Sequence, residues 1–221
     1  MTEMEAIRAR HSVRQYLNKP LKPDELTMLR AEVDACNQES GLHIQLVINE
    51  PKAFEGTMAR YGKFSGVTNY FALVGKAGPD LQEKCGYWGE RLVLKAQMMG
   101  LNTCWVALTF SKVKSAYTLG DGEKLVAVIA LGHGATQGVP HKSKAMDEVA
   151  KADGPMPDWF KAGMEAVLLA PTAVNQQKFQ FTLLEDGRVS TQPGHAFYAK
   201  MDLGIAKYHF EIGAGRENFQ W

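Results

Sequence analysis

Several features that would fix a function class are scarce or absent in this chain. Its three cysteines, Cys36, Cys85 and Cys104, are an odd number with no CxxC pair, which argues against a disulfide framework and favours a reducing cytoplasm. The formal net charge is only +1, so neither nucleic acid nor an acidic membrane is expected as a partner. No apolar run reaches the roughly 18 residues of a membrane-spanning helix. The charged start, MTEMEAIRAR, does not resemble a signal peptide.

Motifs for metal and nucleotide chemistry are also missing. The six histidines show neither HExxH nor a Cys/His spacing, so no metal site is expected. The glycine-rich stretch GHGATQG at 132–138 lacks the lysine and serine of a Walker motif, and Pro140 follows it instead of a helix. No nucleophilic cysteine with a partner is evident either. Any anion site must therefore come from local clusters of side chains.

What the chain has is a globular composition, 45% hydrophobic, with alternating helix and strand patterns. A capping box at Thr2 and Glu5 begins a first helix, and Pro23 begins a second. A hairpin around Asp186-Gly187 is predicted to turn as type I′. Expected helices cover 23–36, 80–100, 157–171 and 199–214, and expected strands cover 43–49, 68–75, 103–108, 124–132 and the hairpin 178–192. This mixture predicts an α+β fold. The part after the loop 132–144 loosely echoes the first part, which hints at internal duplication.

Three segments carry polar side chains suited to a ligand. Arg10 and Arg14 flank Ser12 in RHSVR, and on a helical turn the two arginines would share a face and suit a phosphate. The basic HKSK, 141–144, follows a strand. LAPTAVNQQKF, 169–179, offers neutral donors and acceptors that suit a heterocycle or a sugar. The alternative for each segment, taken alone, is a solvated helix end, a solvated loop or a polar turn.

Together these segments resemble the nitroreductase family of FMN-dependent oxidoreductases. RHSVRQY is similar to that family's opening flavin-binding motif, and GLNTCWVAL (100–108) is similar to the segment after its long central helix. LVAVIALGHG resembles the strand that follows, with HKSK at the usual later place. APTAVNQQKF resembles the family's Pro-Ser-Ser-x-Asn-x-Gln-Pro-Trp motif, although Lys178 and Phe179 replace Pro-Trp. The resemblance implies a central mixed or antiparallel sheet flanked by helices.

One departure points to a TM1586-like subgroup of that family. In ordinary members the Pro-Ser-Ser-x-Asn motif comes soon after the opening arginines, and it approaches the flavin from the neighbouring subunit of a homodimer. Here it lies at 171–177, in the echoing part. The resemblance therefore implies that one chain mimics the dimer, with 1–145 as one pseudo-protomer and 146–221 as a shortened second. It implies one complete flavin site per chain, in a monomer or weak homodimer.

The resemblance also assigns roles to residues around FMN. The phosphate is expected at Arg10, Lys142 and Lys144, while the phosphate, ribityl chain or pyrimidine carbonyls are expected at His11, Ser12 and Arg14. The ring is expected against Trp105, Val106 and Ala107. Contacts from the second half are expected from Pro171, Thr172 and Asn175, and Asn69 is a further candidate for the pyrimidine edge.

The implied activity is an NAD(P)H oxidoreductase in which NADH or NADPH reduces FMN at N5 and a small-molecule acceptor reoxidises it. The acceptor is expected to be a nitroaromatic, a quinone or another compound. No catalytic acid or base is assigned, because the cofactor carries the chemistry. The alternative is a flavin-binding or degenerate protein without turnover that serves as a sensor, store or scaffold.

Overall fold

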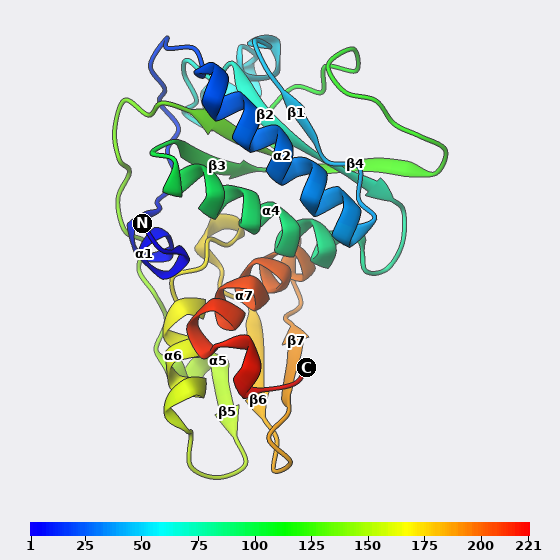
Figure 1. The fold of residues 1–221 in the computed structure, drawn as a ribbon. Helices are drawn as coiled ribbons and strands as arrows, with labels where there is room; N and C mark the ends of the chain where they lie inside the picture. The colour runs from blue at the N-terminus through cyan, green and yellow to red at the C-terminus, as the bar shows by residue number, and fades with distance from the viewer.

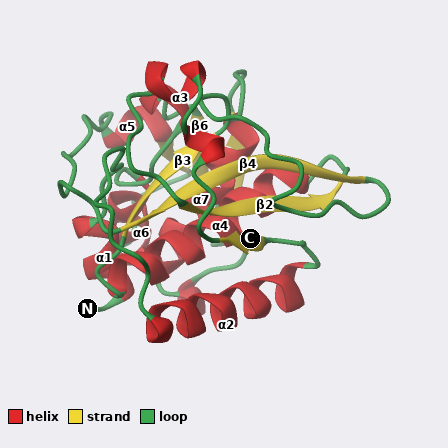
Figure 2. Cartoon of the chain, turned by 90° about the horizontal axis from the view of Figure 1, so that it is seen from above, coloured by secondary structure: helices red, strands yellow, loops and turns green.

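The computed structural model describes all 221 residues, and its first half is a four-stranded antiparallel sheet with helices on both faces. The strands run in the order β1-β2-β4-β3 (Figure 1). Figure 2 shows α2 along one face of this sheet and α3 on the other. The elements of this half are α1 (Glu3–Ala9), α2 (Pro23–Ser40), β1 (Gln45–Val47), a 3₁₀ turn (Lys52–Phe54), α3 (Thr57–Tyr61), β2 (Asn69–Lys76), α4 (Leu81–Met98), β3 (Asn102–Val106) and β4 (Glu123–Gly132).

Strand β2 shows why helices cover both faces of this sheet. Its side chains alternate between two cores: Phe71 and Leu73 pack with α2 and α4, while Tyr70 and Ala72 face the core that includes α3. Successive residues of a strand point to opposite faces, so a strand buried on both faces is a continuous apolar run. The run YFALV is such a pattern. The sheet is thus an interior layer.

The second half carries its own three-stranded sheet and core. Its sheet order is β5-β6-β7, with β5 parallel to β6 and β6 antiparallel to β7. Figure 1 shows this sheet and α6 below α7, with α7 lying beside α4 of the first half. The elements are α5 (Met146–Val149), β5 (Ala150–Ala152), α6 (Asp158–Val167), a 3₁₀ turn (Ala173–Asn175), β6 (Phe179–Leu183), β7 (Val189–Pro193), α7 (Ala199–Ala214) and a 3₁₀ turn (Arg216–Asn218).

Two glycines bring α4 and α7 into backbone contact. A Cβ at Gly86 would strike the carbonyl oxygen of Met201, and a Cβ at Gly204 would strike that of Glu83. Each carbonyl lies three positions before the partner glycine, and each glycine also approaches the amide one position after its partner. The contact is therefore reciprocal, as in an interface that has two-fold symmetry.

The α+β prediction is confirmed, and the predicted helices and strands are all present with shifted ends. The short helices at 52–61 and the elements at 146–152 were not predicted. The turn at Asp186-Gly187 was wrong in type: only Gly187 has a positive φ, +82°, and its N–H donates to the Leu184 carbonyl 3.0 Å away. Leu184 N–H also donates to the Arg188 carbonyl, so the loop is longer than a two-residue type I′ turn. No helix is long and apolar enough to cross a membrane.

Candidate functional site

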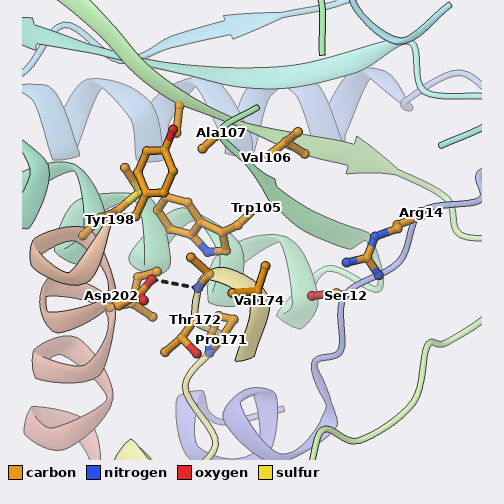
Figure 3. A pocket seen from close by; sticks show the side chains of 14 residues that line it. Ser12, Arg14, Trp105, Val106, Ala107, Pro171, Thr172, Val174, Tyr198 and Asp202 are labelled. Carbon is orange, nitrogen blue, oxygen red and sulfur yellow. Dashed lines mark hydrogen bonds between the residues drawn. The ribbon is translucent and has the colours of Figure 1, made fainter. Parts of the chain in front are cut away.

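A two-part cavity lies where the two halves meet, and Figure 3 shows the residues of its inner compartment. Its inner compartment, of about 130 Å³, has a mainly apolar wall that includes Trp105, Val106, Ala107, Ala127, Met201 and Ile205. Its outer compartment, of about 300 Å³, is polar and includes Arg10, His11, His141 and Asn175. Both are lined by Ser12, Arg14, Pro171, Thr172 and Val174. Because they share these residues, the two compartments adjoin, and the outer one alone reaches the lower end of the size range of small-molecule pockets, about 300–1,000 Å³.

The N-terminal arginines reach the site from extended backbone, so the prediction that a helical turn aligns them was wrong. Helix α1 ends at Ala9, Arg10 has extended dihedrals, and Ser12 forms a parallel bridge to Thr103 of β3. Arg10, Ser12 and Arg14 line the cavity from this segment together with His11, while Val13 is 1% exposed in the core.

Arg10 is the buried cation of the outer compartment. It is only 5% exposed, its Nε has no hydrogen-bond partner, and Nη1 donates to the Leu169 carbonyl at a long 3.4 Å. Burial lowers the pKa of Arg10 from its usual value, and the negative charge of Glu90 opposes that shift. Buried charged donors without partners are costly, so this guanidinium fits an anion in the cavity.

The two histidines of the outer compartment add donors but little charge at neutral pH. Burial lowers the pKa of both His11 and His141, and the positive charge of Arg10 lowers both further. The His141 Nε2 donates to the Leu168 carbonyl at 3.0 Å, because a carbonyl oxygen only accepts. The positive charge of the compartment thus comes from Arg10 and Arg14.

Trp105 forms part of the inner wall and is held from behind by a buried polar network. Its indole Nε1 donates to Glu90 Oε2 at 2.8 Å, and Glu90 Oε1 lies 2.9 Å from Nε2 of His209. His209 Nδ1 in turn donates to the Ala166 carbonyl at 3.0 Å. Glu90 and His209 are both 0% exposed. A side chain at Gly89 would strike the indole, so glycine is needed there. This network joins β3, α4 and α7 and fixes the plane of the indole.

The segment 171–177 closes the cavity from the second half in an unusual backbone conformation. Val174, Asn175 and Gln177 all have positive φ, at 46°, 56° and 45°. A left-handed conformation is a marked outlier for a β-branched residue, and Val174 is 95% exposed. The Asn175 Nδ2 donates to the Lys142 carbonyl at 2.9 Å, and Thr172 Oγ1 accepts from the Gln177 N–H at 3.1 Å. The segment is held by polar contacts.

Asp202, on the first turn of α7, anchors that segment. Its Oδ1 accepts from the Ala173 N–H at 3.0 Å and its Oδ2 from the Gln176 side-chain amide at 2.6 Å. Figure 3 shows the first of these bonds beside Thr172 and Val174. Burial raises the pKa of Asp202 to about 6, against the lowering effect of the two hydrogen bonds. This carboxyl is a titratable group in a mainly apolar wall.

Most of the predicted site residues meet at this cavity, but three do not line it. The Asn69 side chain is occupied elsewhere, because its Oδ1 accepts from the Asn49 N–H and its Nδ2 donates to Thr68. Lys144 Nζ donates to the Gln177 carbonyl at 3.1 Å. Lys142 is exposed, and its backbone carbonyl is what binds Asn175. The lysines therefore support the segment 171–177 and do not form the cavity wall.

Two wall residues, Asp202 and Tyr198, were missed from the sequence, as was the buried Glu90–His209 pair behind Trp105. Tyr198 has a left-handed φ of 64° and precedes α7, so no pattern marks it as a wall residue. The one available signal was the presence of Asp202 between Met201 and Leu203 on an apolar helix. No group of three or more His, Cys, Asp or Glu side chains could hold a metal ion.

Solved structures with the same fold come from several bacteria. A "putative nitroreductase" of Thermotoga maritima superposes with a TM-score of 0.66 at 20% identity, covering 98% of this chain and 85% of that one. A "putative nitroreductase" of Desulfovibrio desulfuricans, solved in complex with FMN, gives a TM-score of 0.51 at 17% identity, covering 71% of this chain and 99% of that one. No curated protein matches. The sequence model of the family described as "Putative TM nitroreductase" matches residues 2–214, and the chain therefore belongs to this nitroreductase family.

Proposed function

We propose that the chain is an FMN-dependent oxidoreductase of the nitroreductase type. It would take electrons from NADH or NADPH and pass them to a small-molecule acceptor such as a nitroaromatic or a quinone. The observation that carries the proposal is an apolar compartment walled by Trp105 that adjoins a polar compartment lined by Arg10, whose buried Nε has no hydrogen-bond partner. FMN has the same sequence of parts: an apolar ring, a ribityl chain and a dianionic phosphate.

The chain's own residues would then divide the binding task. Arg10 and Arg14 would bind the phosphate, and Ser12 and Thr172, which line both compartments, would contact the ribityl chain. Lys144 is already bonded to the Gln177 carbonyl, so it would contribute through that contact.

The ring would lie against the first half. Trp105, Val106 and Ala107 would pack against it, while Pro171 and Asn175 would close the site from the second half. When bound, FMN supplies the hydride chemistry. No protein acid or base is assigned, because the residues here position the ring and limit access of water.

We also propose that residues 1–145 and 146–221 act as two pseudo-protomers with one flavin site between them. The reciprocal contact of Gly86 and Gly204, 118 positions apart, supports a two-fold relation of α4 and α7. The same separation of 118 positions makes Met201 and Ile205, which line the site, correspond to Glu83 and Tyr87 on α4. There Glu83 Oε1 accepts from Lys207 at 2.8 Å and Glu211 accepts from the Tyr87 hydroxyl at 2.6 Å. The side chains of Glu83 and Tyr87 are thus already bonded within the protein, whereas Met201 and Ile205 line the cavity.

The decisive experiment is the visible spectrum of the purified protein, before and after reconstitution with FMN. We expect flavin absorption bands, a flavin:protein ratio of one, and anaerobic bleaching by NADH or NADPH. The variant Arg10→Ala with Ser12→Ala should lose the bands, while Arg30→Ala with Ser115→Ala, a matched change at exposed positions, should keep them.

Each other outcome of this experiment has a defined meaning. Protein that stays colourless after reconstitution contradicts the proposal. Bound FMN that neither nucleotide reduces would indicate a passive flavin-binding protein. A ratio of two would contradict the single pseudo-dimer site.

A further inference from the structure

The amide of Gln176 lies between two acceptors. Its Nε2 donates to Asp202 Oδ2 at 2.6 Å and to the Phe197 carbonyl at 3.0 Å. Asp202 Oδ1 accepts from the Ala173 N–H at 3.0 Å, so both carboxylate oxygens are used. Asp202 is 2% exposed. The Asp202 side chain therefore connects the first turn of α7 to Ala173 and Gln176, the two ends of the segment 173–176.

Burial does not stabilise the conformation of the segment that Asp202 holds. Val174, at its centre, is 95% exposed and has a φ of 46°, and Asn175 has a φ of 56°. Such conformations persist only where surrounding contacts over-determine them. On one side these contacts are Asn175 and Gln177 bound to the Lys142 carbonyl, and on the other side they are the two bonds to Asp202.

We infer that Asp202 is a positioning residue whose ionised carboxylate holds the segment 172–176 against the cofactor cavity. The inference rests on the proposed flavin site, because that segment is the second half's contribution to it. Asp202 itself carries out no chemistry in this scheme. It sets the fraction of molecules in which the cavity is closed, and so sets the apparent affinity for FMN.

The hydrogen-bond pattern favours the ionised form. Protonation makes one oxygen of Asp202 a weaker acceptor, and an asparagine in its place would present a hydrogen to Gln176 Nε2, which is itself a donor. Turning the Gln176 amide over would relieve that conflict but would place Oε1 against the Phe197 carbonyl, so that two acceptors would face each other. At least one bond is lost in either arrangement.

The charged groups around Asp202 leave burial as the main influence on its titration. Arg14 lines the same compartment from the N-terminal segment, and Tyr198 lines it at the start of α7. On α4, which packs against α7, Glu83 is already paired with Lys207. Burial raises the pKa of Asp202 to about 6. The segment should therefore loosen between pH 7.5 and pH 5.

The sign of the stability effect separates this local change from unfolding. A carboxyl whose folded-state pKa is raised binds more protons in the folded than in the unfolded state, so its contribution to the free energy of unfolding increases as pH falls through 6. Acidification should therefore weaken FMN binding without an Asp202-dependent loss of global stability. If Asp202 served only to stabilise the fold, FMN affinity and global stability would change together.

The test is FMN affinity, measured by quenching of flavin fluorescence at pH 7.5 and pH 5. If only the ionised form holds the segment and Asp202→Asn weakens binding about tenfold at pH 7.5, the wild type itself should weaken about fivefold at pH 5 through this group. The ratio of the two dissociation constants should then fall from about ten at pH 7.5 to about two at pH 5. Taking this ratio cancels titration of the FMN phosphate. Asp34→Asn, on the exposed face of α2, is the control and should bind FMN like the wild type.

Gln176→Leu should reproduce the effect of Asp202→Asn, and the double variant should be no weaker than the weaker single variant. Equal affinities of Asp202→Asn and wild type at pH 7.5 would overturn the inference. So would a constant ratio of their dissociation constants across pH.

Hydrogen exchange of the apo protein gives a readout that does not need FMN. Asp202→Asn loses the bond to Gln176 and should loosen the segment, so exchange in the peptide 168–179, which contains the Ala173 amide, should be about tenfold faster at pH 7.5, with Asp34→Asn unchanged. Unchanged exchange would refute the positioning role even if FMN binds. Wild-type protein that binds no FMN at any pH, with faster exchange in Asp202→Asn, would refute the flavin proposal and leave the positioning role standing.

Discussion

Replacing Glu90 tests the network behind Trp105 most directly. Glu90 accepts from the Trp105 indole at 2.8 Å and contacts His209 Nε2 at 2.9 Å, with Glu90 and His209 fully buried. Glu90→Leu keeps much of the volume but leaves two polar groups without partners, at about 1–3 kcal/mol each. We therefore expect a loss of about 4 kcal/mol in the free energy of unfolding. For a chain of this size that is roughly 8–16 °C in Tm.

Glu90→Gln is the matched control. Its side-chain oxygen can accept from the Trp105 indole, and its NH₂ can donate to Nε2 of a neutral His209. His209 Nδ1 would still donate to the Ala166 carbonyl. All three bonds are kept, so this variant should stay within about 1 kcal/mol of the wild type, as expected of a variant that leaves no buried group unsatisfied.

The assay is urea unfolding of the apo protein, followed by circular dichroism, with Trp105→Phe as a third variant. Because Trp105→Phe removes the indole donor, its cost and that of Glu90→Leu should add to more than the cost of the double variant. The reasoning fails if Glu90→Gln is as damaging as Glu90→Leu. It also fails if Glu90→Leu unfolds within about 1 kcal/mol of the wild type.

Three further predictions follow from other parts of the molecule. Gly204→Ala should lower the free energy of unfolding by about 1–3 kcal/mol in urea despite alanine's better helix propensity, because its Cβ meets the Glu83 carbonyl; equal or higher stability would contradict the tight crossing. Arg10→Met should weaken FMN binding about ten- to a hundredfold in fluorescence titration but leave riboflavin binding unchanged, since only FMN has the phosphate; equal losses would argue against this contact. The thiols of Cys36, Cys85 and Cys104 are buried, which raises the pKa of each, to about 12 for the first two, so a disulfide reagent should label none within minutes until urea is added.

Local patterns predicted the helices and strands well, because the spacing of apolar residues within an element indicates which of its faces is buried. The apolar run of β2 is a property of neighbouring residues. The hairpin turn was misread in type because Asp-Gly is compatible with more than one loop length, and the choice depends on strand register. The short helices at 52–61 have no sustained period to detect.

The site residues likewise divide into those that local motifs indicated and those that they did not. Ser12, Trp105 and Thr172 stand in recognisable motifs, and the structure brings them to one cavity. Lys144 and Asn69 do not line the cavity, and the sequence could not show this, because it shows that a polar side chain is present but not which partner it bonds.

The sequence alone determined the α+β class, the order of elements and the motifs that identify the family. Those features are local, since capping residues, strand alternation and motif spacing act within a few positions of the chain. Only the tertiary structure decided that the segment 10–14 is extended, that Glu90 meets His209 119 positions later, and that Asp202 holds 173–176. The physical reason is that a buried polar group is stable only beside its partner, and the packing of α4 against α7 selects that partner.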